Sequence, residues 1–319
     1  MAFSWHERNE ALASLAKQPP ELLVIGGGVV GCSIAAHAAA QGLNVALVEA
    51  GDFAVGASGN STGLAHAGLR YLVQGRIAYV FKECRERLRL EALAPHWVRP
   101  FSFLFPVYKG DPYGLFLLRL GTALYDALYR VASWGLPKHP GRRYRMLSKE
   151  LVLERVRNLS AEGLQGAAQY FVDARLQDSR FTLGFAQAAA AKKARVVTYT
   201  HVEQVHVENG RVTTVRLKDG LTGKEIEVAP KLVINATGAW IDELRKLAGL
   251  TNPILQNSKG IHLLVDQLAD QPLILTSRIP GKVFFVIPVE QSLSLVGTTD
   301  TAYTGRPGQE NAQNIGNFG

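Results

Sequence analysis

The sequence has few cysteines and no long hydrophobic run. Its 319 residues include two cysteines, Cys32 and Cys84, which exclude a disulfide-rich scaffold and a four-cysteine zinc site. The most apolar stretch, residues 112–136, is interrupted by charged residues, so we expect no transmembrane helix. The first residues lack the apolar core of a signal peptide. We therefore expect a cytoplasmic protein and no metal site.

Acidic residues are outnumbered by basic ones, 27 against 35, which gives a formal charge of +8. That charge suits an anionic substrate, an anionic cofactor or an anionic membrane surface. No block of basic residues is interleaved with aromatic residues, so we expect no nucleic-acid partner. An apolar fraction of 47% indicates a folded chain, and the length allows two domains or one large α/β domain with insertions.

The front of the chain has the pattern of one βαβ unit. A short apolar run, residues 22–25, ends in three glycines, and an alanine-rich segment, residues 30–41, follows it. A second apolar run, residues 44–48, ends at Glu49. The apolar runs are typical of buried parallel strands, and the segment between them is typical of a helix.

The three glycines open a Gly26-x-Gly28-x-x-Gly31 motif after the strand and at the start of the helix, where a dinucleotide site requires it. Gly26 permits a tight turn, Gly28 lets the backbone approach a pyrophosphate, and Gly31 lets the helix pack closely on the strand. Glu49, at the end of the second strand, is placed to accept hydrogen bonds from the adenosine ribose. A carboxylate there repels a 2′-phosphate, which disfavours NADP.

Two further segments favour FAD over NAD. Residues 56–63 are mostly small, so their backbone can lie along a pyrophosphate, a ribityl chain and a flavin ring. Ala236-Thr237-Gly238 follows a later apolar run and is placed to approach the same cofactor. An NAD enzyme of this type usually continues with more βα units, whereas this chain continues with a long helical and β insertion.

The chain resembles the FAD-dependent glycerol-3-phosphate dehydrogenases over roughly residues 20–305. The glycine motif, Glu49 and the Ser58-to-Thr62 loop carry part of the resemblance. Five blocks carry the rest: residues 66–72 (HAGLRYL), 172–175 (VDAR), 234–240 (INATGAW), 258–262 (SKGIH) and 297–300 (GTTD). Many flavoproteins share the glycine motif, whereas LRYL and GTTD are much more specific.

The resemblance implies an α/β fold, in which a Rossmann-like FAD-binding domain carries an inserted β-rich (α+β) substrate domain, as in D-amino-acid and glycine oxidases. It implies oxidation of sn-glycerol 3-phosphate to dihydroxyacetone phosphate by hydride transfer to flavin, with electrons passed to quinone or another acceptor. We accordingly expect an FAD-binding domain at residues 20–100 and 160–257, a substrate domain at 101–159 and 258–305, an N-terminal arm or short helix at 1–19 and a polar tail at 306–319.

The resemblance also assigns candidate site residues. Arg70 is the candidate for binding the substrate phosphate, Tyr71 for a hydrogen bond to substrate, and His262 for accepting the hydroxyl proton or polarising the forming ketone. Asp173 and Asp178 are interpreted as an ion-pair residue and a helix start. The cofactor-binding set is Gly26, Gly28, Gly31, Glu49, Ser58, Ser61, Thr62, His66, Val202, Ala236 and Gly238.

The sequence departs from the family at three places. Gly63 stands where the family usually has lysine or another polar residue, and Ala67 stands where it usually has glycine. The family continues well past Asp300 with further substrate-binding residues, so we expect this chain to be a fragment of a longer reading frame. Two alternatives stay open: an amine or 2-hydroxy-acid oxidase in which Arg70 binds a carboxylate, and an inactive flavin-binding module.

One apolar helix face has two interpretations. It is marked by Leu117, Leu120, Leu124, Leu128 and Val131. Such a face most often packs in a core, and the alternative is peripheral contact with the inner face of the cytoplasmic membrane.

Overall fold

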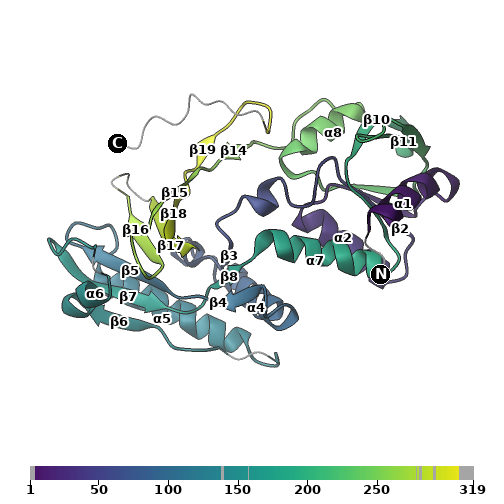
Figure 1. The fold of residues 1–319 in the computed structure, drawn as a ribbon. Helices are drawn as coiled ribbons and strands as arrows, with labels where there is room; N and C mark the ends of the chain where they lie inside the picture. Colours follow the sequence, from purple (N-terminus) through teal and green to yellow (C-terminus); the bar gives the residue numbers. More distant parts are fainter. Residues whose placement is uncertain are drawn as a thin grey trace. The chain divides into compact units, whose positions relative to one another are not determined.

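The chain forms two compact units in the computed structural model, which describes residues 4–137, 140–156, 158–277, 279, 282–289 and 292–308 (Figure 1). The first unit contains residues up to Ser61, residues 178–258 and residues from Ala302 onward, and the second contains residues 62–177 and 259–301. The α/β class is as predicted. The units divide the chain at other points than expected, because residues 62–100 and 160–177 pack within the second unit.

The first unit is built around a parallel sheet in the order β13-β1-β2-β9. Its strands are β1 (Leu22–Ile25), β2 (Val45–Val48), β9 (Arg195–Val197) and β13 (Leu232–Asn235). All residues of β1 and β2 are buried, which explains their continuous apolar sequence. Leu22 and Val24 pack into the core on one face of the sheet, and Leu23 and Ile25 into the core on the other.

Helices cover one face of this sheet, and two helices with a second sheet cover the other. α2 (Val29–Ala40) and α7 (Asp178–Ala191) lie side by side on the first face, where alanines of both helices share a core (Figure 1). The other face packs against α1 (Trp5–Lys17), α8 (Ile241–Leu247) and the antiparallel strands β10 (Thr200–Glu208), β11 (Arg211–Asp219) and β12 (Glu225–Val228). The β10–β11 hairpin turns at Asn209 and Gly210, which have φ of 50° and 74°.

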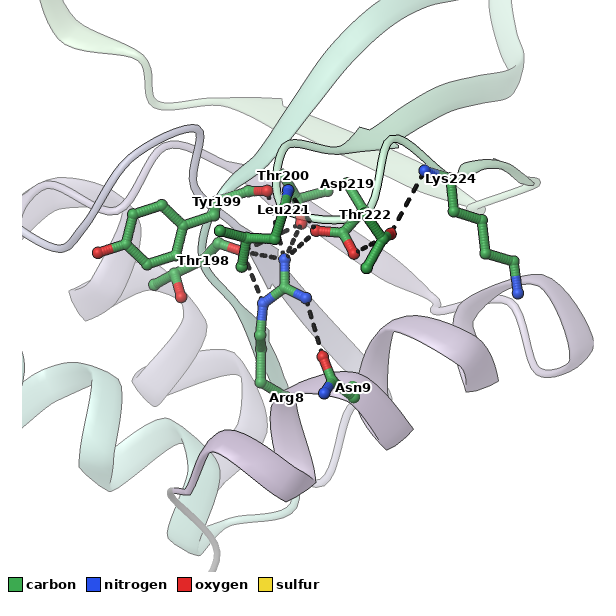
Figure 2. Close-up of polar contacts among 9 residues, drawn as sticks. All are labelled: Arg8, Asn9, Thr198, Tyr199, Thr200, Asp219, Leu221, Thr222 and Lys224. Carbon is green, nitrogen blue, oxygen red and sulfur yellow. Dashed lines mark hydrogen bonds and ion pairs between the residues drawn. The ribbon is translucent and has the colours of Figure 1, made fainter.

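The N-terminal residues form a packed helix rather than a free arm. Leu12 and Leu15 of α1 are buried in the core of the first unit. Arg8 forms an ion pair with Asp219 at the end of β11, with 2.6 Å between Nη2 and Oδ1, and the two side chains are 5% and 4% exposed (Figure 2). The Thr222 hydroxyl donates to the other carboxylate oxygen of Asp219 at 2.6 Å. This helix therefore belongs to the folded unit.

The stability of the first unit should depend on pH through Asp219. Burial alone would raise the pKa of this carboxyl, but hydrogen bonds from Arg8 and Thr222 outweigh burial and hold the pKa below its usual value. The Asp219 contribution is therefore complete above the unfolded pKa of about 3.9 and is lost as the pH falls through the folded pKa. We expect Asp219→Asn to lower the free energy of unfolding by about 3 kcal/mol at pH 7, because it leaves Arg8 buried without its counter-ion. Urea titrations between pH 3 and 7 should show this difference shrinking toward low pH, and a difference that does not change with pH would contradict the assignment.

The second unit contains a mixed sheet in the order β15-β18-β17-β16-β5-β7-β6. Its strands are β5 (Phe103–Tyr108), β6 (Arg145–Ser148), β7 (Leu164–Tyr170), β15 (His262–Asp266), β16 (Leu273–Thr276), β17 (Val283–Val289) and β18 (Leu293–Gly297). One face packs against α4 (Ile77–Leu93) and α5 (Leu115–Ala132), which follow the short α3 (Leu69–Val73). α4 adds Val80, Cys84 and Leu88 to this core, which is why this segment belongs to the second unit. α6 (Lys149–Arg155) packs against the other face.

Short elements complete the two units. The second unit also has a small sheet of β3 (Leu64–Ala65), β8 (Ala174–Leu176) and β4 (Val98–Pro100). The 3₁₀ turns η1 (Ala57–Gly59) and η2 (Gly238–Trp240) belong to the first unit. β14 (Ser258–Lys259) and β19 (Thr301–Ala302) lie where the chain passes from one unit to the other. Of the predicted tail, residues 309–319 lie outside the described residues.

The expectation that the leucine-rich face of α5 packs in a core is wrong. Leu117, Leu120, Leu124 and Val131 are exposed, whereas the buried face is formed by Leu118, Thr122, Tyr125, Asp126, Tyr129 and Ala132. The buried polar atoms have partners, since the Tyr125 hydroxyl donates to Asp173 at 2.7 Å. The number of aliphatic residues on a helix face therefore does not identify the buried face of α5. No helix of the described residues is long and apolar enough to cross a membrane.

Candidate functional site

Three predicted cofactor-binding residues meet at one edge of the parallel sheet. Gly26 follows β1, Glu49 follows β2 and Ala236 follows β13. The Gly26 amide donates to the Val48 carbonyl at 2.8 Å, and the Ala236 amide donates to the Ile25 carbonyl at 2.8 Å. The carboxyl ends of parallel strands are where α/β sheets bind ligands, so the topology brings these residues together at the expected place.

The glycine motif forms a close-packed turn in which a side chain at Gly26 or Gly31 would clash with neighbouring backbone atoms. Gly26 has φ of 115°, and a Cβ on it would lie 2.5 Å from the Ala236 carbonyl oxygen. A Cβ on Gly31 would lie 1.9 Å from the Gly26 carbonyl oxygen, so Gly31 lets α2 pack directly on the turn. Gly28 is the N-cap of α2, and the Ser58 hydroxyl accepts a hydrogen bond from the next amide, Val29, at 2.9 Å. A helix start with a serine hydroxyl beside it fits a pyrophosphate.

The Glu49 carboxylate binds the glycine turn from the next strand. Its Oε2 accepts a hydrogen bond from the Gly27 amide, and its Oε1 accepts one from the Gly51 amide at 2.7 Å. The Glu49 carbonyl accepts from the Thr200 amide at 2.8 Å, which places the start of β10 beside the turn. Each carboxylate oxygen keeps a second lone pair for a ribose hydroxyl. Val202 lies two residues after Thr200 on β10, and its contact with the cofactor stays a prediction.

The Ala236–Gly238 turn is held in shape by Asn235. The Asn235 side-chain amide donates to the Ile241 carbonyl at 2.9 Å, and its oxygen accepts from the Thr237 amide at 3.2 Å. Gly238 begins the 3₁₀ turn with φ of 56°. The turn therefore presents backbone rather than side chains beside Gly26, as the sequence suggested. Asn235 was missed because it reads as the last residue of an apolar strand.

The small-residue loop is divided between the two units, with Ser61 in the first and Thr62 in the second. Ser58 contacts the start of α2, and the Ser61 hydroxyl donates to the Asp178 carboxylate at the start of α7. Thr62 lies in the other unit, where its Oγ1 lies 3.1 Å from Nε2 of His262. The structure therefore groups Ser58 with the glycine turn and Thr62 with a candidate catalytic residue. Cofactor contacts by Ser61 and Thr62 stay predictions.

His262 is a partly buried residue at the edge of a strand pair. It begins β15, and its backbone lies opposite Gly297 of β18. A Cβ on Gly297 would lie 3.1 Å from Cδ2 of His262, so a glycine there leaves room for the ring. Burial lowers the pKa of His262, which favours the neutral imidazole at pH 7. The Thr62 hydroxyl shows that Nε2 faces a hydrogen-bonding partner.

The remaining candidates lie on or before α3. The Tyr71 ring packs on Gly68 and meets the Tyr79 ring edge-on at a centroid distance of 5.1 Å, so packing explains at least part of its role. Arg70 is a residue of α3, and its side chain is outside the described part of the chain. His66 is exposed and lies close enough to Asp173 to lower the pKa of that carboxyl.

Asp173 is a buried hydrogen-bond centre, so its interpretation as an ion-pair residue is incomplete. Its carboxylate accepts from the Tyr125 hydroxyl at 2.7 Å and from the Ala67 amide at 3.3 Å, and its carbonyl accepts from Arg87 at 3.1 Å. Burial raises the pKa of Asp173. Ala67 itself is fully buried in the core of the second unit, so its extra methyl group, relative to the family glycine, fills core space. The acidic residue directly after the apolar run that ends at Val172 was the sequence signal for this centre.

A parallel sheet with a glycine turn, a helix start and a carboxylate at one edge defines a dinucleotide-binding protein. The chain belongs to the FAD dependent oxidoreductase family, whose match covers residues 21–317. FAD is the cofactor of this family, and the glycine turn, Ser58 and Glu49 are the residues here that fit it.

Relatives with similar sequences have names that refer to glycerol phosphate. The chain is 37% identical over 314 residues to the alpha-glycerophosphate oxidase of Streptococcus pyogenes serotype M1, covering 96% of this chain and 50% of that protein. It is 36% identical to the aerobic glycerol-3-phosphate dehydrogenase of Bacillus subtilis (strain 168), covering 94% of this chain and 53% of that protein. The chain therefore spans about half the length of these curated relatives.

Solved structures agree with the family. The glycerol-3-phosphate dehydrogenase from Bacillus halodurans complexed with FAD matches with a TM-score of 0.72 and 30% identity, over 94% of this chain and 51% of that chain. The L-proline dehydrogenase from P. horikoshii matches with a TM-score of 0.65 and 19% identity, over 88% of this chain and 69% of that chain, and shows the fold alone.

Proposed function

We propose that this chain carries the cofactor site and part of the substrate site of an enzyme that oxidises sn-glycerol 3-phosphate to dihydroxyacetone phosphate. The glycine turn beside Glu49 carries the proposal for the cofactor. The names of the relatives support the substrate. The proposed activity therefore refers to a polypeptide that also contains the remaining substrate-binding residues.

His262 is the proposed acid–base residue. When bound, FAD supplies the acceptor for the hydride of the secondary carbinol. The neutral His262 ring takes the proton from the hydroxyl of the same carbon, and the Thr62 hydroxyl orients the ring through Nε2. Arg70 binds the phosphate through two hydrogen bonds, and Tyr71 donates to the substrate.

Replacing Arg70 with alanine should raise the KM for glycerol 3-phosphate by about 30–150-fold and leave FAD bound. Loss of one charge-assisted contact costs about 2–3 kcal/mol, and KM rises without a matching change in kcat when that contact is equal in ground and transition states. Steady-state kinetics over a range of glycerol 3-phosphate concentrations would measure the change. Arg76→Ala, at the N-cap of the next helix, α4, is the matched control, and an unchanged KM in the Arg70 variant would remove Arg70 from the phosphate site.

The proposed electron acceptor is a membrane quinone or another oxidant, and the exposed face of α5 is the proposed peripheral membrane contact. The face contains Leu117, Leu120, Leu124, Val131 and the nearby Trp134, which is 83% exposed. Arg130 of α5 donates to the Gly141 carbonyl at 3.3 Å, which brings the exposed Arg142 and Arg143 near the end of the helix. An apolar stripe with basic residues beside it suits an anionic lipid surface.

Leu120→Glu should weaken binding to vesicles of phosphatidylcholine and phosphatidylglycerol by at least about tenfold, because burying one leucine in lipid is worth about 1.5–3 kcal/mol. Co-sedimentation at several lipid concentrations would measure this. Leu221→Glu changes an exposed leucine in the other unit and serves as the control. Equal binding of the three proteins would exclude the α5 face as the membrane contact.

A further inference from the structure

Arg8 of α1 binds the backbone of the segment that connects β9 to β10. Its Nε and Nη2 donate to the Thr198 carbonyl at 3.0 and 2.7 Å, and Nη2 also lies 3.3 Å from the Tyr199 carbonyl (Figure 2). Nη2 lies 3.3 Å from the Thr200 hydroxyl and 2.6 Å from Asp219. Because the guanidinium is planar and rigid, these bonds fix the position of the connection relative to α1.

The same connection binds the loop that follows β2. The Tyr199 amide donates to the Gly51 carbonyl at 3.0 Å, and the Thr200 amide donates to the Glu49 carbonyl at 2.8 Å. Tyr199 has φ of 51°, a conformation that is uncommon for a residue with a side chain and that needs support from its surroundings. Arg8 supplies such support by binding the carbonyls of Thr198 and Tyr199.

Glu49 connects this loop to the glycine turn. Its side chain accepts hydrogen bonds from the Gly27 and Gly51 amides. A continuous set of hydrogen bonds therefore runs from Arg8 through Tyr199 and Thr200 to Glu49 and the turn of the dinucleotide motif. All of these residues belong to the first unit.

We infer that Arg8 is a positioning residue for the adenosine end of the cofactor site. It does not lie at the glycine turn; it holds the backbone that fixes Glu49, the carboxylate placed to accept the ribose hydroxyls. Helix α1, which precedes the dinucleotide motif in the sequence, is thereby part of the apparatus that binds FAD. The inference rests on the proposed function only in its cofactor, FAD, and does not depend on the proposed substrate.

The chain offers a matched control in Arg195, which binds the other end of α1. Arg195 donates to the Gln18 carbonyl at 2.6 Å and to the Asn44 side chain at 2.8 Å. Both arginines therefore fasten α1, and Arg8 alone of the two binds residues 198–200 in the described contacts. A comparison of the two separates loss of helix anchoring from loss of Glu49 positioning.

The test compares Arg8→Gln with Arg195→Gln in the full chain, with FAD affinity measured by fluorescence titration. We expect the Kd for FAD to rise about tenfold in Arg8→Gln, the effect of misplacing one hydrogen-bonding group, and less than about twofold in Arg195→Gln. Hydrogen exchange of the ligand-free proteins should show faster exchange at the Gly51, Tyr199 and Thr200 amides in Arg8→Gln only. Arg8→Lys, which retains the charge and one donor group, should give intermediate values.

Equal changes in Kd for the two glutamine variants would overturn the inference, as would unchanged exchange at the three amides in Arg8→Gln. The exchange measurement needs no cofactor, so it decides the structural part even if Arg8→Gln binds no FAD. Neither measurement includes glycerol 3-phosphate, so a failed substrate assignment would leave both results unaltered.

Discussion

Replacing His262 with glutamine should lower the rate of flavin reduction by glycerol 3-phosphate by about 10²–10⁴-fold, the usual contribution of a positioned acid–base group. Glutamine retains a hydrogen-bonding group near Thr62 but cannot accept the hydroxyl proton at pH 7. FAD affinity should remain unchanged, because the glycine turn and Glu49 lie in the other unit. Anaerobic stopped-flow absorbance would measure the reduction rate in the polypeptide that turns over substrate.

His201→Gln is the control for this variant, because His201 is exposed on β10. It should leave the reduction rate within about twofold of the wild type, as surface substitutions usually do. A His262→Gln variant that reduces flavin at the wild-type rate would eliminate His262 as the proton acceptor. A fall in rate that is accompanied by an equal loss of FAD affinity would assign it a structural role instead.

Replacing Gly31 with alanine should abolish measurable FAD binding and lower the free energy of unfolding by about 3 kcal/mol, the upper end of the usual cost of overpacking. The added Cβ would lie 1.9 Å from the Gly26 carbonyl oxygen, and the backbone fixes the position of both atoms, so neither can rotate away. Helix α2 must then move from the turn that approaches the pyrophosphate. Urea unfolding and FAD titration would measure the two effects.

Gly121→Ala provides the matched comparison within another helix. Gly121 lies in α5, and a Cβ there would meet nothing within 4 Å. That variant should gain about 0.5–1 kcal/mol of stability from the higher helix propensity of alanine and should bind FAD normally. If Gly31→Ala also kept FAD affinity and stability, the close contact at the glycine turn would have no role in binding.

The local elements of the first unit were predictable because their signals lie close together in the sequence. The strand, glycine turn, helix and second strand follow one another within residues 22–48, and their composition marks them, since the strands are continuous apolar runs and the helix is rich in alanine. The meeting of Gly26, Glu49 and Ala236 was also predictable, because the carboxyl ends of parallel strands share one edge. The Asn209-Gly210 turn required only its two residues.

The features that the sequence did not reveal depend on distant or polar partners. Arg8 and Asp219 are 211 positions apart, so no local pattern connects them. The buried face of α5 contains Thr122 and Tyr125, which enter the core because their hydroxyl groups have hydrogen-bond acceptors there. The order of the mixed sheet likewise depends on the pairing of β5 with β16, which joins segments more than 100 residues apart.

The division of the Ser58-to-Thr62 loop between two units had no signal either. Small residues predict a backbone that can approach a ligand, but they do not say which side chain points to which partner. Ser58 contacts α2, whereas Thr62 contacts His262. Two residues of this one short loop therefore contact partners in different units of the chain.

The visible spectrum of the FAD-loaded protein, recorded without oxygen before and after glycerol 3-phosphate is added, tests the proposed activity most directly. We expect glycerol 3-phosphate to bleach the flavin band, and glycerol and glycine at the same concentration to leave it unchanged. A flavin band that persists with glycerol 3-phosphate but bleaches with glycine or a 2-hydroxy acid would contradict the proposed substrate. A band that none of these compounds bleaches would contradict the proposed activity of this polypeptide.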